Sequence, residues 1–178
     1  STGVVSVAIL SNGTAIADTI QIVSIEITYN VNKIPSAKIT LLDGDLPNSD
    51  FPVSNTDDFK PGAVITINAG YDNQTTAIFK GIVTKHGIKM DGDNFSRLIV
   101  QCRDSAVAMT IGRKNANFVD SKDSDIISKL IGAYSGLSSD VTATTTSFKE
   151  LVQYYCTDWD FMLIRAEANG FLVTVDAG

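Results

Sequence analysis

A change of hydrophobic period near residue 104 constrains the fold of this chain more than any other feature. Before that point, apolar and polar residues alternate in short runs, as in the stretch 25–30, where apolar Ile25, Ile27 and Tyr29 are separated by polar residues. Such alternation predicts strands with one face exposed to solvent. Beyond it, apolar residues recur at helical spacing. We therefore expect a mainly β fold: a β-barrel over residues 1–105, then a small helical α/β subdomain over residues 106–178.

Frequent turn signals divide the first half into six or seven short strands, which indicates a closed barrel or a sandwich. Ser11-Asn12-Gly13 is typical of a hairpin turn, and Asp91-Gly92-Asp93-Asn94 predicts another turn. The long irregular stretch from Gly44 to Lys60 predicts a mobile surface loop. Strands are expected at residues 4–10, 25–30, 38–42, 64–69, 78–86 and 96–102.

The second half predicts helices. After one short helical turn at 104–109, the apolar stripe from Ser124 to Tyr134 predicts a helix with Asp123 or Ser124 as its N-cap. A second helix is expected at 158–169, between a Thr157 cap and a Gly170 stop, with Trp159 packed in the core. A last strand, 171–175, ends close to the terminus and lacks a partner, so we expect a truncated subdomain from a longer protein.

The composition argues against several functional classes. The net charge is −6, and the 14 Lys and Arg residues are scattered along the chain, which argues against nucleic-acid binding and against anionic membranes. The sequence contains neither an apolar run long enough to span a membrane nor a visible signal peptide, so the expected compartment is the cytoplasm. Cys102 and Cys156 could form one bridge, or each could be a small buried residue.

A search for catalytic, cofactor or metal sites finds none, and we expect no enzyme activity. The sequence contains no Gly-x-Ser-x-Gly nucleophile elbow that His86 could serve as a catalytic base. His86 is therefore interpreted as an exposed strand-end residue. Three histidine and cysteine residues are a poor supply for zinc. The acidic groups are interpreted as turns or helix caps: Asp43-Gly44-Asp45, Asp91-Gly92-Asp93, and Asp120 with Asp123 and Asp125. A carboxylate pair suited to glycoside hydrolysis stays open, because sequence does not give its separation.

The segment from Val152 to Gly170 reads VQYYCTDWDFMLIRAEANG and is similar to a family signature written VQY…D.DF…R..E..G. Together with the motifs before it, this pattern resembles the Vgr-type spike proteins, which belong with phage late-control protein D and the phage baseplate hub. The resemblance covers about residues 60–170. It rests on the order of loose motifs: Phe59-Lys60-Pro61-Gly62, Phe79-Lys80-Gly81-Ile82-Val83, Leu98-Ile99-Val100-Gln101-Cys102-Arg103-Asp104, Ile126-Ile127-Ser128-Lys129-Leu130, and the Val152–Gly170 segment.

The resemblance implies a structural role. Members of the family are trimers in which each subunit supplies two similar barrels, so that a pseudo-sixfold ring docks on a hexameric tube protein beneath a needle-like spike. We therefore expect a hub module that is assembled in the cytoplasm with other baseplate proteins and then secreted or injected, and that associates weakly when its second barrel is missing. The sequence departs from the family at Tyr155-Cys156-Thr157, and it leaves open whether the particle is a secretion system, a phage tail or a related device.

Two alternatives from other classes remain. One is a stand-alone β-sandwich binding module, for example for carbohydrate, in which Trp159, Tyr154 and Tyr155 would be exposed for sugar stacking. The other is a hydrolase that uses carboxylates the sequence does not single out.

Overall fold

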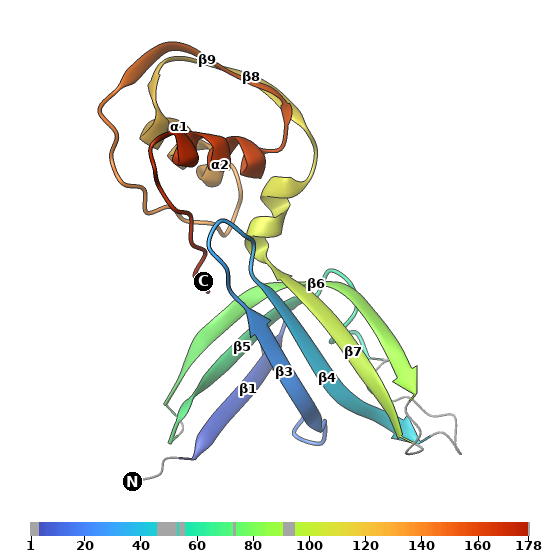
Figure 1. The fold of residues 1–178 in the computed structure, drawn as a ribbon. Helices are drawn as coiled ribbons and strands as arrows, with labels where there is room; N and C mark the ends of the chain where they lie inside the picture. Colours follow the sequence, from blue (N-terminus) through green and yellow to red (C-terminus); the bar gives the residue numbers. More distant parts are fainter. Residues whose placement is uncertain (1–3, 46–52, 54–55, 73, 91–94, 178) are drawn as a thin grey trace. The chain divides into compact units, whose positions relative to one another are not determined.

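The computed structural model describes residues 4–45, 53, 56–72, 74–90 and 95–177. The fold is mainly β, as the sequence predicted (Figure 1). The chain divides into two compact units. Unit 1 comprises Ser1–Tyr29, Pro35–Asp104 and Asp176–Gly178, and unit 2 comprises Asn30–Ile34 and Ser105–Val175.

Unit 1 is a single antiparallel sheet of seven strands in the order β2-β1-β5-β6-β7-β4-β3. The strands lie close to the predicted positions, although β6 is far longer than expected. Their bounds are β1 Val5–Ser11, β2 Thr14–Ala15, β3 Ile22–Thr28, β4 Ser36–Asp45, β5 Val64–Tyr71, β6 Gln74–Met90 and β7 Phe95–Asp104. The predicted hairpin turn between β1 and β2 is confirmed, with φ values of 49° at Asn12 and 85° at Gly13.

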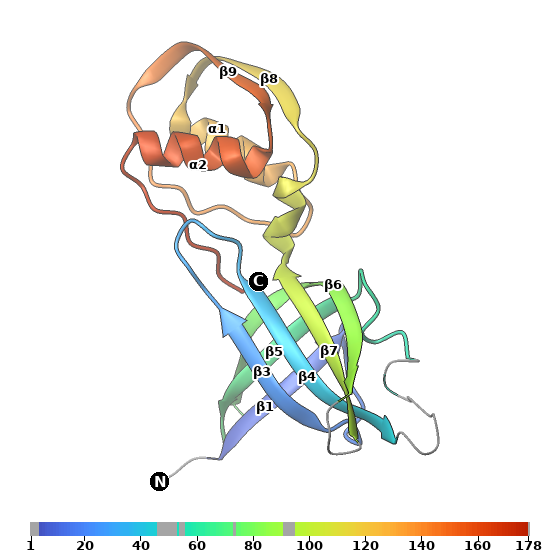
Figure 2. The same cartoon turned by 45° about the vertical axis from the view of Figure 1, so that its right-hand side comes forward.

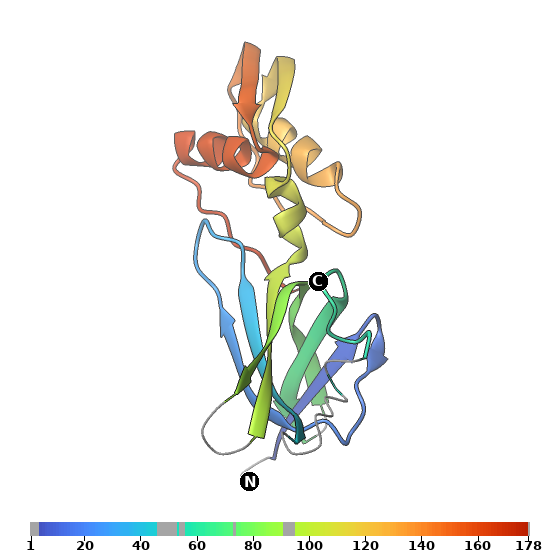
Figure 3. The ribbon, with the colours of Figure 1, turned by 90° about the vertical axis from the view of Figure 1, so that its right-hand side faces the viewer.

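The sheet of unit 1 curls around one apolar core. Ile9 on β1 and Ile39 on β4 belong to the same buried cluster, although three strands separate β1 from β4 in the sheet. A flat sheet would hold these side chains far apart, so the apolar face must close on itself, and the curvature is visible in Figure 3. Among the described residues no backbone pairing joins the two outermost strands, β2 and β3.

Two expectations for the region after β4 were wrong. Asp43-Gly44-Asp45 is not a turn but the end of β4, where the register with β7 shifts between Leu42 and Asp45. The predicted mobile surface loop contributes to the core instead, because Val53 and Phe59 are buried. Val53 is also held by its backbone N–H, which donates to the buried Asp43 carboxylate at 2.8 Å. Residues 46–52 and 54–55 of that loop and the Asp91–Asn94 turn lie outside the described residues.

Unit 2 pairs a two-stranded ribbon with two helices (Figure 2). A 3₁₀ helix, η2 (Ser105–Thr110), stands where one helical turn was predicted. The remaining elements are β8 Lys114–Lys122, α1 Asp123–Gly132, β9 Ser147–Cys156 and α2 Asp158–Ala168. The β8–β9 ribbon was not predicted from the sequence. Trp159 is buried in the core of this unit, as predicted, together with Met162 and Ala166 from the same helical face.

The expected strand at 171–175 is absent from the described secondary structure. Instead, Val173 exchanges two hydrogen bonds with Asn32: its carbonyl accepts from the Asn32 N–H, and its N–H donates to the Asn32 side chain, both at 2.8 Å. Phe171, Val173 and Val175 pack partly buried against the core of unit 2. A single residue, Asn32, thus replaces a strand partner through its backbone N–H and its side chain, and the alternating apolar residues reflect burial rather than sheet pairing.

The ends of α2 agree with the sequence prediction. The Thr157 hydroxyl accepts from the Asp160 N–H at 3.1 Å at its start. At its end, Gly170 adopts a φ of 68°, and the N–H groups of Gly170 and Phe171 donate to the carbonyls of Glu167 and Ala166, each at 2.9 Å. This is a Schellman motif, which favours glycine because of the positive φ.

The glycine of the Phe79-Lys80-Gly81 motif permits close packing of β6 on β7. A Cβ atom at Gly81 would lie 2.1 Å from the Arg103 carbonyl oxygen and 2.9 Å from the Phe79 ring. We therefore expect Gly81→Ala to lower the free energy of unfolding by about 1–3 kcal/mol, measured by urea denaturation. Gly87→Ala is the matched control: it lies on the same strand with open space around it, and its effect should stay within about 0.5 kcal/mol. Equal effects would contradict this account.

Candidate functional site

Three polar side chains converge on the buried carboxylate of Asp158, a residue of the Val152–Gly170 motif at the start of α2. Gln153, buried on β9, donates to Asp158 Oδ1 at 2.8 Å. Lys114 on β8 and Tyr134, which follows α1, donate to Asp158 Oδ2 at 2.7 and 2.6 Å. One carboxylate therefore ties both strands of the ribbon and the segment after α1 to the first turn of α2.

The surroundings of Asp158 set its charge state. Burial alone would raise the pKa of this carboxyl, but hydrogen bonds from Gln153, Lys114 and Tyr134 outweigh burial and hold the pKa below its usual value. In return, the hydrogen bond to Asp158 raises the pKa of Lys114. Asp158 is therefore an anion at neutral pH and accepts all three hydrogen bonds in that state.

A second polar contact joins the two helices. Arg165 on α2 binds the Asp123 carboxylate with both ends of its guanidinium group, Nε to Oδ1 at 2.5 Å and Nη2 to Oδ2 at 3.0 Å. The side-chain amide of Asn169 also donates to Asp123 Oδ2, at 2.8 Å. Burial would raise the pKa of Asp123, but the hydrogen bonds from Arg165 and Asn169 lower it overall. The guanidinium group also lies over the Phe148 ring of β9, 5.1 Å from its centroid.

These contacts correct the interpretation of Asp123 as a helix cap. The N-cap of α1 is Lys122, which makes no capping hydrogen bond through its side chain. Asp123 is buried and pairs with Arg165, which lies 42 residues away in the sequence. Spacing within the sequence could not show this pairing. The one available signal in the sequence was Arg165 of the motif. A guanidinium charge on a buried helix face needs an anionic partner.

The other candidate residues are dispersed. His86 lies within β6 opposite Val100, not at a strand end, and its Nδ1 is 2.9 Å from the Phe59 carbonyl oxygen. Cys102 belongs to the core of unit 1 and Cys156 to unit 2, and both are free thiols. Burial raises the pKa of Cys102 to about 12, so this thiol stays protonated and unreactive at neutral pH.

The acidic residues do not assemble into a metal centre in the part of the chain that the structure describes, where no group of three His, Cys, Asp or Glu side chains is placed to hold an ion. Asp120 and Asp125 are exposed, whereas Asp123 belongs to the ion pair with Arg165. Asp91 and Asp93 lie outside the described residues.

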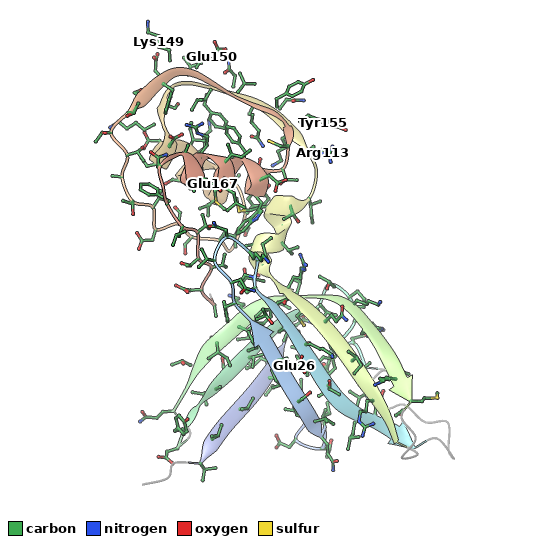
Figure 4. The ribbon with its side chains drawn as sticks, in the orientation of Figure 1. Glu26, Arg113, Lys149, Glu150, Tyr155 and Glu167 are labelled. Atoms are coloured by element: carbon green, nitrogen blue, oxygen red, sulfur yellow. The ribbon has the colours of Figure 1, made fainter. Side chains whose placement is uncertain are left out.

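The outward face of the β8–β9 ribbon exposes apolar side chains. Val119, Val152 and Tyr154 are exposed there, while the inward residues Phe118 and Leu151 face the core of unit 2. Arg113 lies over the exposed Tyr155 ring, 5.1 Å from its centroid. Figure 4 shows Lys149, Glu150, Tyr155 and Arg113 projecting away from the helices. Trp159, by contrast, is only 6% exposed and faces inward, so it cannot stack on a sugar.

Comparison with known proteins places the chain in a family. Residues 1–178 match the family described as the Alg8 N-terminal domain, and the chain belongs to that family. None of the curated proteins matches the sequence.

Solved structures share the fold at low sequence identity. The chain is similar to the 43 kDa tail protein of prophage MuSo2 from Shewanella oneidensis, with a TM-score of 0.72 and 13% identity over 98% of this chain and 54% of that one. It is also similar to the E. coli c3393 protein, a type VI secretion system component described as similar to the T4 tail proteins gp27 and gp5. There the TM-score is 0.62 and the identity 13%, over 86% of this chain and 41% of that one.

A third similar structure is a chain of the Francisella PdpA–VgrG complex, with a TM-score of 0.58 and 13% identity over 93% of this chain and 25% of that one. The fold is therefore that of phage-tail and type VI secretion proteins. The chain spans about half or less of the length of these structures. Among the described residues, none of the helices has the length and apolarity to cross a membrane.

The ion pair between α1 and α2 gives a testable stability difference. Arg165→Ala would leave the Asp123 carboxylate buried without its cation, and we expect the free energy of unfolding to fall by about 3–5 kcal/mol. Arg165→Lys should recover only part of this loss, because an ammonium group cannot form both guanidinium contacts. Lys149→Ala, at an exposed position of β9, is the control, with an expected change within about 0.5 kcal/mol. Denaturation midpoints that do not separate Arg165→Ala from Lys149→Ala would refute the role assigned to the pair.

Acid should weaken unit 2 through Asp158. A carboxyl whose folded pKa lies below its unfolded value of about 3.9 stabilises the fold above that pH, and this contribution is lost as the pH falls through the folded pKa. At pH 7, Asp158→Asn should cost on the order of 1–3 kcal/mol. Between about pH 5 and pH 2 the difference between the variant and the parent should shrink, because the parent's carboxyl becomes neutral too. Urea denaturation across this range measures the difference, and a constant gap would contradict the assignment.

Proposed function

We propose that the chain is a structural hub module of a contractile injection particle or phage tail, related to the Vgr-type spike proteins. In this role it takes part in joining a trimeric spike to a hexameric tube, next to other baseplate proteins. It acts through shape and surface contacts and not through catalysis. Its assembly takes place in the cytoplasm, and it leaves the cell as part of the particle.

The observation that carries this proposal is the use of the motif inside the fold. Gln153, Asp158 and Arg165 all have internal partners, and Gly170 ends α2. The segment that carries the main resemblance thus builds a scaffold, and among the described residues no group of three His, Cys, Asp or Glu side chains is placed to hold a metal ion. The similar folds of tail and type VI secretion proteins support the same reading.

The carbohydrate-binding alternative receives no support from the position of Trp159. That module would use Trp159 together with Tyr154 and Tyr155 as an exposed stacking surface. The tyrosines are exposed, but Trp159 is packed beside Met162 in the core of unit 2. The aromatic residues therefore do not form one stacking platform, and we do not propose a sugar ligand.

The hub proposal is tested by the composition of the particle. In particles purified from cells that produce the protein, quantitative mass spectrometry should count three copies for each six-subunit tube ring at the spike end, and cryo-electron microscopy should locate them between spike and tube. Cells lacking the protein should produce no spike-capped tubes. His86→Ala should leave assembly intact, because no chemistry is assigned to that side chain. Complete particles without the protein, or copies located away from the junction, would refute the hub role.

A further inference from the structure

The β8–β9 ribbon groups large apolar side chains on the face that points away from the core of unit 2. Val152 and Tyr154 lie two positions apart on β9, and Val119 on β8 is the diagonal neighbour of Val152. These three residues are 55%, 81% and 60% exposed, respectively. Apolar side chains that are grouped on a surface, and not scattered singly, mark interaction sites. The ribbon face, as we name this surface, consists of Val119, Val152, Tyr154, Tyr155 and Arg113.

Tyr155 is held in a backbone conformation that tyrosine rarely adopts. Its φ of 44° lies in the left-handed region, where a bulky side chain is strained. Two contacts fix the residue there: its N–H donates to Asn115 Oδ1 at 2.8 Å, and the Arg113 guanidinium group lies over its ring, 5.1 Å from the centroid. The side chain is 60% exposed, so burial of the ring does not account for the strain. Strain that the core does not require is typical of functional sites.

The ribbon is a basic segment of an acidic chain. Together with Arg113, which directly precedes β8, it contains four of the 14 Lys and Arg residues of the chain but two of the 20 Asp and Glu residues. One of the four, Lys114, is paired with the buried Asp158. Among the described residues, neither an ion pair nor a side-chain hydrogen bond involves Arg113, Lys122 or Lys149. These three exposed cations are therefore available to an anionic partner.

The irregular strands of the ribbon favour a contact with its face over the addition of a third strand at its edge. The register of β8 on β9 shifts between Lys114 and Ala116. Farther along β8, Asp120 has a φ of 47°, and Tyr155 interrupts the regular backbone of β9 in the same way. Bulges and charged residues of this kind oppose pairing with a further strand.

We infer that the ribbon face is a docking surface for another protein, whose contact surface has an apolar centre and a carboxylate that meets Arg113. Tyrosine and arginine are the residues that dominate binding hot spots. Because the guanidinium N–H groups of Arg113 make no hydrogen bond among the described residues, they can bind a carboxylate with two parallel bonds. The unpaired cations along the ribbon favour an acidic partner for the same reason.

Other occupants fit the ribbon face less well. Two ribbon faces in contact would bring their unpaired cations together, which opposes a symmetric contact between copies of the chain. Single-stranded nucleic acids need open aromatic faces and a positively charged groove. Arg113 already covers one side of the Tyr155 ring, and the carboxylates of Asp120 and Glu150 are exposed on the same ribbon, where they would repel phosphates.

Photo-crosslinking in purified particles tests the surface. Tyr154→p-benzoylphenylalanine places the reactive group on the ribbon face, and Ile164→p-benzoylphenylalanine is the control, since Ile164 is an exposed apolar residue of α2. Position 154 should cross-link to a different protein several times more than position 164. Mass spectrometry of the linked peptide should place an Asp or Glu residue close to the link. Equal yields at the two positions, or links only to a second copy of the chain, would overturn the inference.

A charge swap tests the carboxylate, with the cross-linked protein as the probe. Arg113→Glu should weaken its binding to the purified chain, measured by calorimetry, about tenfold or more. Lys33→Glu changes the net charge equally at an exposed position of unit 2 outside the ribbon, and it should leave binding unchanged. Replacing the probe's carboxylate beside the link by lysine should restore binding to the Arg113→Glu variant. Equal binding by the parent and Arg113→Glu, or a swap that restores nothing, would contradict the proposal.

The strained tyrosine separates binding from stability. Glycine tolerates a φ of 44°, so Tyr155→Gly should melt close to the parent while binding to the same probe falls about tenfold or more. Asp120→Gly relieves the other left-handed residue of the ribbon and should retain binding. A folded Tyr155→Gly variant that binds the probe like the parent would show that the ring is not part of the contact, and the inference would fail.

A nucleic-acid partner would give a different result. Fluorescence anisotropy with a labelled oligothymidine strand should show no binding that depends on Arg113, and binding that is lost in the Arg113→Glu variant would overturn the inference. These experiments concern only the ribbon face, whereas the location of the protein in the particle tests the hub role. A chain found away from the junction would still cross-link through position 154, so the two proposals can fail separately.

Discussion

The structure of unit 2 depends on one buried anion, Asp158. Its two oxygens collect hydrogen bonds from β8, from β9 and from the segment after α1, although it belongs to the first turn of α2. Removing a carboxylate from water is costly, and here the cost is offset because three donors, one of them a cation, replace the lost hydration. A two-stranded ribbon is only marginally stable by itself, so this shared anion and the apolar core behind it hold β8 and β9 on the helices.

The Arg165–Asp123 ion pair is a second polar contact of unit 2 and lies toward the other end of α2 from Asp158. It joins α2 to the first residue of α1, while the Phe148 ring covers the guanidinium group from β9. Both centres involve polar residues of the Val152–Gly170 motif, and both point them inward. The motif is therefore explained by architecture: it specifies how a short helix sits against a ribbon and another helix.

Unit 1 follows a different principle. Apart from local register shifts, its strands alternate between a core side and a solvent side, and the same alternation that buries Ile39 and Val100 turns Lys38 and Gln101 outward. Because the sheet curls, all the core residues meet, and the outward residues of neighbouring strands are brought together as a continuous surface. Which residues share that surface is thus a consequence of strand register. A shift of one residue in β6 would turn its lysines toward the core.

Much of the fold could be predicted from the sequence, because the interactions involved are local. Apolar and polar residues that alternate with period two indicated the strands of unit 1, and apolar stripes with a period of 3.6 residues indicated both helices. Thr157 and Gly170 marked the ends of α2. The helical spacing of Trp159 and Met162 indicated that Trp159 lies in the core. Each of these signals depends on residues within a few positions of one another. What only the tertiary structure decided was which distant residues meet. The β8–β9 pairing, the partner of Asp123, the burial of Phe59 and the hydrogen bonds between Asn32 and Val173 join segments far apart in the sequence. The surface that the outward residues of β4, β6 and β7 share depends on the same long-range pairing, since a single sequence records which residues alternate along a strand but not which strands become neighbours.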